Sequence, residues 1–275
     1  MEKRLSLVLV AVFCVTLFAG CGPDVRSAMD RIQANKEIIV GVKGDTPPFG
    51  YHDRNKQLRG FDVELAGAIA MKLGVKPKFV PLTTAERIPA LQNRRVDLVA
   101  ACMTITRERE RLIDFTMPYF ETSQGLLVRA DSPINDYLDL EKKKVGATKG
   151  STGMAMMKIV QPDAVIVPFD GYKAAMTALK AGTIDALATD HIILVGLLKG
   201  KTDQFKIAGS FGWEPYGLGI RENDSALRGK VNEVLQEMWD EGLFQEIYDS
   251  WFGEKGQYPT GSAFTMTTFP KGNLK

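Results

Sequence analysis

The fold is decided by one stretch of sequence, Asp97-Leu98-Val99-Ala100-Ala101-Cys102-Met103-Thr104-Ile105-Thr106-Arg107-Glu108-Arg109. Its apolar start, residues 96–101, predicts a short buried strand. Thr106 is a predicted N-cap for a helix that carries Glu108 in its first turn. A strand, a loop with hydroxyl groups and a helix N-terminus with arginines follow one another, which favours a carboxylate site at Thr104 and Arg109. For this stretch alone, an ordinary loop with solvated arginines is the alternative.

Strands and helices alternate before this stretch. Residues 38–42 and 78–82 predict two further strands. One helix is predicted to begin with Asp62 as its N-cap, and a second is predicted over residues 84–93. This β-α-β-α-β alternation implies a parallel sheet flanked by helices, so the expected fold class is α/β.

The chain repeats one helix–strand joint. Residues 90–100 match residues 178–188 in the order helix end, tight turn, branched residue, aspartate and apolar strand. A strand over residues 144–148 and a glycine-rich turn over residues 149–153 precede the second copy. These features predict a second α/β unit over roughly residues 124–212, with chance similarity of the two joints as the alternative.

The N-terminus has the features of an export signal. Residues 1–20 combine two basic residues, an apolar run and an end of small residues. The end of this segment resembles a bacterial lipobox, so we expect lipidation at Cys21 and a tether over residues 21–36. Phe18 departs from the leucine that a lipobox usually has there. A short N-terminal anchor helix is the alternative.

Charge and cysteine content exclude several functions. The 275 residues carry a formal net charge of +2, which argues against nucleic acid or a polybasic membrane surface as the main partner. After removal of the signal and lipidation of Cys21, only Cys102 is left, so no intramolecular disulfide is expected. The only histidines are His52 and His191, and we expect no catalytic triad, metal site or cofactor.

The residues that follow the predicted strands suit an amino acid. In open α/β sheets, ligands bind beyond the carboxyl ends of the strands, and two facing sheets would bring these residues to one cleft. Arg109 is predicted to clamp an α-carboxylate with help from Thr104 and from the loop of Ser151 and Thr152. Asp190 is predicted to accept hydrogen bonds from an α-ammonium group.

Eight short motifs occur in one order along the chain. They are Asp45–Phe49, Gly60–Leu65, Arg87–Gln92, Val96–Leu98, Met103–Thr106, Asp114–Phe115, Pro118–Tyr119 and Trp251–Gly253. Together they resemble the family 3 solute-binding proteins, which are periplasmic amino-acid receptors of ABC importers. The resemblance covers about residues 36–253. It implies two α/β lobes, each with a mostly parallel sheet flanked by helices, and a ligand cleft that closes between them.

The resemblance also implies a domain organisation and partners. Lobe 1 is expected over residues 37–122 and 214–252, lobe 2 over residues 123–213, and a C-terminal tail over residues 253–275. The expected protein is a monomer that is not an enzyme. It binds an amino acid, delivers it to an ABC transporter permease, and lies in the periplasm or at the cell surface, held to a membrane by lipid on Cys21.

The family's binding residues map onto this sequence position by position. Its carboxylate-binding arginine and threonine fall at Arg109 and Thr104, and its ammonium-binding aspartate falls at Asp190. Arg107 stands where the family usually has proline. The complete set of expected ligand-binding residues is Lys43, Asp45, Phe49, Tyr51, Arg87, Ala101, Met103, Thr104, Arg109, Ser151, Thr152 and Asp190.

Lys43 and Arg87 suggest the specificity. Family members selective for glutamate and aspartate resemble this chain at both positions, and a second buried carboxylate needs its own positive partners. We therefore expect an acidic ligand. A receptor for neutral or basic amino acids, in which Asp45 helps to hold the ligand side chain, is the alternative within the family.

Two candidate functions lie outside transport. A dehydratase of cyclic dienyl acids on the same fold would need a carboxyl group in the cleft, for which Glu86 or Glu214 could be considered. The second is a sensory input module that acts through a partner protein.

Overall fold

The computed structural model describes residues 27–260. The predictions for the export signal and for lipidation of Cys21 lie outside these residues. Within residues 27–260, no helix combines the length and the apolar character that crossing a membrane requires.

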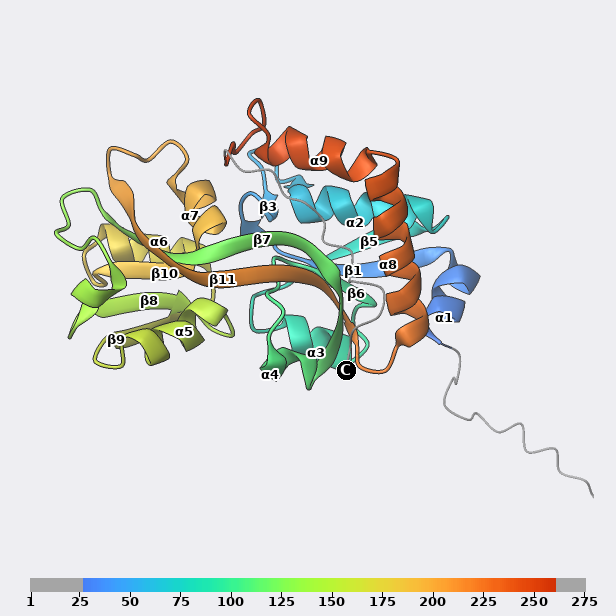
Figure 1. The fold of residues 1–275 in the computed structure, drawn as a ribbon, viewed down its shortest axis with the longest axis horizontal. Coiled ribbons are helices and arrows are strands. Elements are labelled where there is room, and N and C mark those ends of the chain that lie inside the picture. Colours follow the sequence, from blue (N-terminus) through green and yellow to red (C-terminus); the bar gives the residue numbers. More distant parts are fainter. Residues whose placement is uncertain (1–26, 261–275) are drawn as a thin grey trace, which may run out of the picture.

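One sheet of eight strands connects the two lobes, in the order β5-β1-β6-β11-β7-β10-β8-β9 (Figure 1). Its strands are β1 (Glu37–Val42), β5 (Lys76–Pro81), β6 (Leu98–Ala100), β7 (Ile113–Arg129), β8 (Lys144–Thr148), β9 (Val165–Phe169), β10 (Ala186–Asp190) and β11 (Phe205–Arg221). The antiparallel pair β7 and β11, with 17 residues each, runs through both lobes. A small sheet of β2 (Asp45–Thr46), β3 (Gly50–His52) and β4 (Leu58–Arg59) completes the strands of the described part of the chain.

Helices cover both sides of the sheet (Figure 1). They are α1 (Ala28–Asn35), α2 (Phe61–Lys72), α3 (Arg87–Gln92), α4 (Arg107–Glu110), the 3₁₀ helix η1 (Tyr137–Leu140), α5 (Thr152–Val160), α6 (Tyr172–Lys180), α7 (His191–Leu198), α8 (Ser225–Asp240) and α9 (Leu243–Phe252). The parallel strands β5, β1 and β6 belong to lobe 1, and the parallel strands β10, β8 and β9 belong to lobe 2. A separate sheet in each lobe was the expectation from the sequence. The sheets join because β7 and β11 pair with strands of both lobes, and the exact lobe boundaries stay a prediction.

Alternating residues of the strands supply separate cores on the two faces of the sheet. In β6, Leu98 and Ala100 belong to a core that also contains residues of α2, α6, α7, α8 and α9, whereas Val99 packs on the opposite face with residues of α3. In β10, Leu187 belongs to the same large core, and Ala186 packs on the opposite face with Met157 of α5. Because side chains alternate along a strand, β6 and β10 are buried on both faces.

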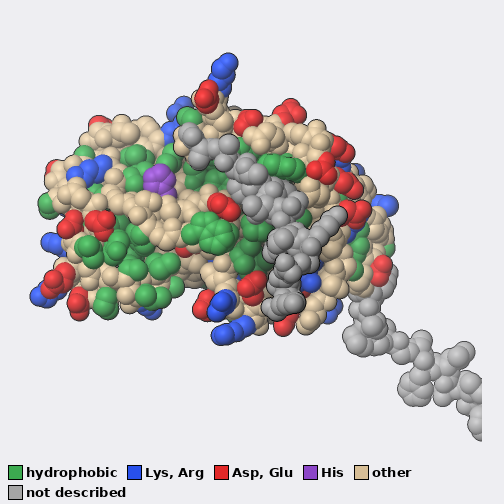
Figure 2. Space-filling view, viewed as in Figure 1, with side chains coloured by type: hydrophobic (Ala, Val, Ile, Leu, Met, Phe, Trp, Pro, Cys, Tyr) green, Lys and Arg blue, Asp and Glu red, His purple; other side chains and the backbone are tan. Residues whose placement is uncertain are grey.

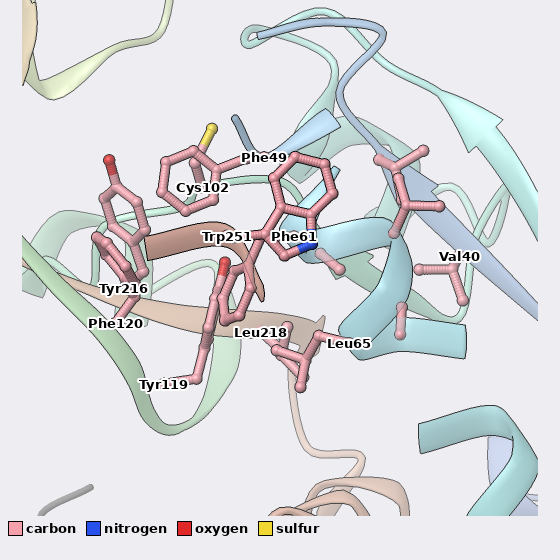
Figure 3. Packing of buried hydrophobic residues seen from close by; sticks show 14 of the residues in the cluster. Val40, Phe49, Phe61, Leu65, Cys102, Tyr119, Phe120, Tyr216, Leu218 and Trp251 are labelled. Carbon is pink, nitrogen blue, oxygen red and sulfur yellow. The ribbon is translucent and has the colours of Figure 1, made fainter. Parts of the chain in front are cut away.

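A cluster of aromatic rings forms the centre of the large core (Figure 3). The ring of Phe49 lies 5.2 Å from that of Phe120 and 5.3 Å from that of Tyr216, in edge-to-face contacts. Phe61 and Phe252 form another edge-to-face pair at 5.1 Å. These contacts join the loop after β1 to the crossing strands and to the last helix, which fixes the position of that loop relative to β7 and β11.

The internal repeat has a structural counterpart. Asp97 and Asp185 stand at the same place in the two copies, just before β6 and β10. The Asp97 carboxylate accepts a hydrogen bond from the backbone N–H of Ile39 at 2.9 Å, and Asp185 accepts one from the backbone N–H of Lys144 at 2.8 Å. Each aspartate thereby ties its strand to the neighbouring parallel strand, β1 in lobe 1 and β8 in lobe 2.

Charged side chains of both signs are mixed around the face drawn in Figure 2, which displays no extended patch of one sign over the described residues. This distribution agrees with the small net charge of the chain.

A helical glycine lies where the lobes touch. A Cβ atom on Gly196 of α7 would overlap the carbonyl oxygen of Pro47 in lobe 1 and would lie 3.0 Å from Cδ of Pro48, whereas a Cβ on Gly67 of α2 would meet no atom within 4 Å. Gly196→Ala is therefore expected to lower the free energy of unfolding by about 1–3 kcal/mol through overpacking. Denaturant unfolding followed by circular dichroism measures this change.

The matched control is Gly67→Ala, which should raise the free energy of unfolding by about 0.5–1 kcal/mol because alanine favours a helix. Equal stability of Gly196→Ala and the unmodified chain would contradict the assigned contact.

Candidate functional site

A small cavity lies between the two lobes. Its wall is polar on both sides and consists of Thr84, Arg87, Cys102, Thr104 and Arg109 from lobe 1 and Ser151, Thr152, Tyr172, Thr189, Asp190 and Ile193 from lobe 2. Because residues of both lobes line this cavity, a ligand bound there would contact both of them.

Arg109 is positioned by the short helix α4. Thr106 is the N-cap of this helix and accepts a hydrogen bond from the backbone N–H of Arg109 at 3.2 Å, as the sequence predicted. The Arg109 guanidinium donates to the carbonyl oxygens of Thr104 at 2.7 Å and Gly150 at 3.0 Å. Arg109 is 8% exposed, whereas Arg107 on the same helix is exposed to solvent. Burial lowers the pKa of Arg109 to about 10, so the guanidinium stays charged at neutral pH.

Arg87 lies beside Arg109 and is also buried, with 4% of its surface exposed. From the start of α3, its guanidinium donates to the carbonyl oxygens of Thr84 at 3.0 Å, Ala101 at 2.9 Å and Cys102 at 3.0 Å. A longer bond of 3.4 Å reaches the carbonyl of Gly150. These partners are neutral, and no carboxylate in residues 27–260 forms an ion pair with Arg87.

Asp190 supplies the negative charge of the wall at the end of β10. Its carboxylate accepts hydrogen bonds from the Gln124 amide at 2.6 Å and from the Tyr216 hydroxyl. Burial raises the pKa of Asp190 to about 6, and the nearby Glu214 carboxylate adds to this shift. The cavity thus has two guanidinium groups and a single carboxylate in its described wall.

Hydroxyl groups occupy the space between these charges. The Ser151 hydroxyl caps α5 by accepting from the backbone N–H of Met154, and it donates its proton to the carbonyl of Thr148. The Thr152 hydroxyl donates to Glu214 at 2.9 Å. Both hydroxyl protons thus have acceptors within the protein, and the part that this loop takes in ligand binding stays a prediction. An anion at the start of α5 would use backbone N–H groups there, together with the Thr104 hydroxyl.

Lys43 and Asp45 are not among the residues of the cavity wall, and their contact with a ligand stays a prediction. The Lys43 ammonium is 1% exposed and lies 3.2 Å from the Asp45 carboxylate and 3.1 Å from the Thr84 hydroxyl. Asp45 also accepts a hydrogen bond from the backbone N–H of Tyr172 at 3.2 Å, at the N-terminus of α6 in lobe 2. The pair therefore supports Thr84 and links the lobes.

Four more of the expected residues are also outside the wall. Phe49 is fully buried in the aromatic cluster, Met103 packs in the core beneath β6, and the Tyr51 ring packs against Trp251. Ala101 contributes only the carbonyl that holds Arg87. Aromatic and sulfur-containing side chains in these motifs serve packing, because the parallel strands of lobe 1 are covered on both faces.

Several residues of the wall, among them Thr84, Tyr172 and Ile193, were not expected from the sequence. Tyr172 and Thr189 are joined by a hydrogen bond of 2.7 Å between their hydroxyls. Thr189 stands one repeat after Ala101, so the internal repeat carried a signal for its position. Nothing in the sequence indicated Tyr172. It lies on α6, and only the packing of this helix in the folded protein brings its side chain close to Thr189 of β10.

Asp62 supports the wall from behind. It is the second residue of α2 and not the expected N-cap, a position that Gly60 occupies. Its buried carboxylate accepts hydrogen bonds from the backbone N–H of Cys102 at 2.7 Å and from the Tyr119 hydroxyl at 2.8 Å. Cys102 has a left-handed backbone with φ of 40°, so this hydrogen bond holds an unfavourable conformation at the cavity.

Neither carboxylate considered for a dehydratase reaches the cavity. Glu86 is half-buried outside the cavity wall and accepts hydrogen bonds from Thr83, and Glu214 is buried behind Thr152. Within residues 27–260, no group of three or more His, Cys, Asp or Glu side chains is arranged to hold a metal ion.

Comparison with known proteins agrees with this architecture. The family model described as bacterial extracellular solute-binding proteins, family 3, matches residues 38–254. The ABC transporter glutamine-binding protein GlnH of Bacillus subtilis is 37% identical over 270 residues, which cover 92% of this chain and 98% of that protein. The L-arginine-binding protein of Pseudomonas aeruginosa is 33% identical over 82% of this chain and 91% of that protein.

A solved structure is similar over most of the chain. The structure of an ancestral arginine-binding protein bound to glutamine is 41% identical, with a TM-score of 0.77 over 80% of this chain and 99% of that chain. The described architecture thus corresponds to that of two-lobed amino-acid-binding proteins.

The buried Asp62 carboxylate predicts a pH dependence of stability. Burial raises its pKa from 3.8 to about 7 in the folded protein, so between pH 4 and 7 the folded state keeps a proton that the unfolded state loses. The contribution of this carboxyl group to the free energy of unfolding is therefore complete below pH 4, and it is lost as the pH rises toward 7. Relative to Asp62→Asn, the unmodified protein should lose up to about 1.4 kcal/mol of unfolding free energy per pH unit in this window.

Denaturant unfolding at several pH values, without ligand, tests this prediction. The exposed Asp131 provides the control Asp131→Asn, which should follow the unmodified protein at every pH. If the stability difference between Asp62→Asn and the unmodified protein is constant with pH, Asp62 does not hold a proton in the fold.

Proposed function

The chain belongs to the family 3 extracellular solute-binding proteins of bacteria, and we propose that its ligand is an acidic amino acid, glutamate or aspartate. The general role is that of an amino-acid receptor for an ABC importer. The proposal concerns the side chain of the ligand and the residues that bind it.

The charge balance of the cavity wall carries this proposal. An α-amino acid has one carboxylate and one ammonium group, which Arg109 and Asp190 can pair with. The Arg87 guanidinium is then left with neutral carbonyl partners in a buried site, where an unpaired charge is costly. A carboxylate at the end of the ligand side chain would neutralise it. A cationic side chain would instead lie against Arg87 and be repelled.

Glutamine is the second candidate. The relative in Bacillus subtilis is named for glutamine, and the ancestral arginine-binding protein was solved with glutamine bound. The oxygen of a side-chain amide could accept from Arg87, but it would leave the positive charge of Arg87 without a counter-ion. This difference favours glutamate over glutamine.

The cellular setting follows from the N-terminus and the family. The extracellular family fits a protein of the periplasm or cell surface. We infer a lipid on Cys21, a tether to the first lobe and a monomeric receptor that meets its permease at the membrane. The relatives are named as binding proteins, which supports a binding role for this chain.

Isothermal titration calorimetry on ligand-stripped protein tests the specificity. Three or four charged hydrogen bonds of about 1.5–3 kcal/mol each support micromolar binding, roughly −8 kcal/mol. We expect L-glutamate or L-aspartate to bind at least tenfold more tightly than L-glutamine and L-arginine. Tight binding of glutamine or arginine without binding of either acid would refute the acidic specificity and leave the receptor role intact.

Arg109→Ala should weaken binding of any amino acid. Loss of a charged pair costs about 1.5–3 kcal/mol, so the dissociation constant should rise by about tenfold or more. The control is Arg107→Ala on the same helix, whose side chain is exposed and should leave the affinity unchanged. Equal affinity of Arg109→Ala and the unmodified protein would remove Arg109 from the site.

Arg87→Met should change selectivity more than overall affinity. The variant loses the charge that favours a second carboxylate, so the preference for glutamate over glutamine should fall by about tenfold, which corresponds to about 1.4 kcal/mol. Arg95→Met removes a half-exposed arginine that pairs with Glu86 and serves as the control. If Arg87→Met weakens glutamate and glutamine equally, Arg87 only supports the wall.

A further inference from the structure

Asp190 in the cavity wall and Glu214 behind Thr152 are two buried carboxylates that interact electrostatically, near the place where an ammonium group would bind. Asp190 is 4% exposed and Glu214 is 2% exposed. Within residues 27–260, no lysine, arginine or histidine forms an ion pair with either of them. Two neighbouring buried carboxylates without a basic partner cannot both be charged at low cost.

A continuous set of hydrogen bonds connects the two carboxylates. The Gln124 amide nitrogen donates to Asp190 at 2.6 Å and to the Thr152 hydroxyl at 3.2 Å. The Thr152 hydroxyl in turn donates to Glu214 at 2.9 Å, and Tyr216 donates to the other oxygen of Asp190. Gln124, Glu214 and Tyr216 lie on the crossing strands β7 and β11, so this network joins the cavity to the strands that connect the lobes.

The Gln124 amide oxygen is buried without a hydrogen-bond partner among the described residues. In the observed orientation, the amide nitrogen faces Asp190, which suits an ionised carboxylate that only accepts. A rotated amide would turn its oxygen toward Asp190, which suits a protonated carboxyl that donates. The network therefore has a hydrogen-bonding arrangement for each charge state of Asp190.

The surroundings of Asp190 determine which state is preferred. Glu214 on β11 opposes its ionisation, and Arg109 on α4 favours it. Burial raises the pKa of the Tyr216 hydroxyl on β11, the Tyr172 hydroxyl on α6 and the Cys102 thiol after β6. These three neighbours of Asp190 are therefore neutral near pH 6. Burial lowers the pKa of His191, the next residue on α7, so its ring is neutral near pH 7.

We propose that the Asp190–Glu214 pair couples ligand binding to proton release, with Glu214 as the positioning residue that sets this coupling. The inference rests on the proposed function only in that an α-ammonium group binds beside Asp190. In the ligand-free protein near pH 6, burial and repulsion by Glu214 together keep part of the population protonated at Asp190. An arriving ammonium group supplies the missing positive charge, and the proton leaves to solvent.

Isothermal titration of L-glutamate and L-glutamine at pH 6, in phosphate and in Tris-type buffers, measures the released proton. The binding enthalpy should depend on the ionisation enthalpy of the buffer, and the dissociation constant should rise by about fivefold between pH 6 and pH 5. Glutamine has no side chain that titrates here, so the effect belongs to the protein. A buffer-independent enthalpy and a flat affinity from pH 5 to 7.5 would overturn the proposal.

The variant Glu214→Gln tests whether Glu214 acts on Asp190 through its charge or only through its place in the fold. Without the repulsion, burial alone raises the pKa of Asp190, so the affinity should change less between pH 6 and pH 5 than it does in the unmodified protein. Glu121→Gln, at an exposed carboxylate on β7, should keep the pH profile of the unmodified protein. An unchanged profile in a folded Glu214→Gln protein contradicts the role of Glu214.

Carbon-13 NMR titration of the ligand-free, unmodified protein measures the ionisation of Asp190 directly, with a variant needed only to assign its signal. One aspartate carboxyl, identified by its absence from the spectrum of Asp190→Asn, should titrate clearly above pH 5. If neither amino acid binds, the proposed function fails while this titration still tests the pair. If amino acids bind and Asp190 titrates near pH 4, the pair is refuted and the proposed function stands.

Discussion

The carbonyl oxygen of Gly150 accepts hydrogen bonds from both Arg87 and Arg109, and this contact joins the two lobes at the cavity. It brings two buried guanidinium groups of lobe 1 against the loop that begins α5 in lobe 2. Gly150 has a left-handed φ of 76°, and a Cβ there would lie 3.1 Å from the backbone of Ala85. A neutral carbonyl cannot balance two positive charges in a buried site, so the closed arrangement favours an anionic ligand beside it.

The crossing strands make the site and the connection between lobes parts of one structure. β7 contributes Gln124, and β11 contributes Glu214 and Tyr216, to the hydrogen bonds around Asp190. The same Tyr216 ring packs in the aromatic cluster with Phe49 and Phe120 (Figure 3). A change in the charge of Asp190 therefore affects the hydrogen bond from Tyr216, whose ring is held in place by the aromatic cluster. Ligands that bridge Arg109 and Asp190 favour closure because they bind the closed form more tightly.

The two-lobed α/β fold class and part of the cavity wall were predictable from the sequence. Arg109 was predictable because Thr106 marks the helix start, and Asp190 because the repeat places it one unit after Cys102. Lys43 and Asp45 were assigned to the ligand because their charges stand in a loop after a strand. Their pairing with each other and with the N-terminus of α6 depends on contacts across the lobes, and no local pattern encodes such contacts. The place of Tyr172 in the cavity wall also depends on tertiary contacts that the local sequence does not encode. So do the acceptors of the Ser151 and Thr152 hydroxyl protons.

A crystal structure of the protein with L-glutamate tests the central claim most directly. We expect the α-carboxylate on Arg109, the α-ammonium on Asp190 and the side-chain carboxylate within hydrogen-bond distance of the Arg87 guanidinium. A bound glutamate whose side chain points away from Arg87, with Arg87 bonded only to the carbonyls of Thr84, Ala101 and Cys102, would contradict it.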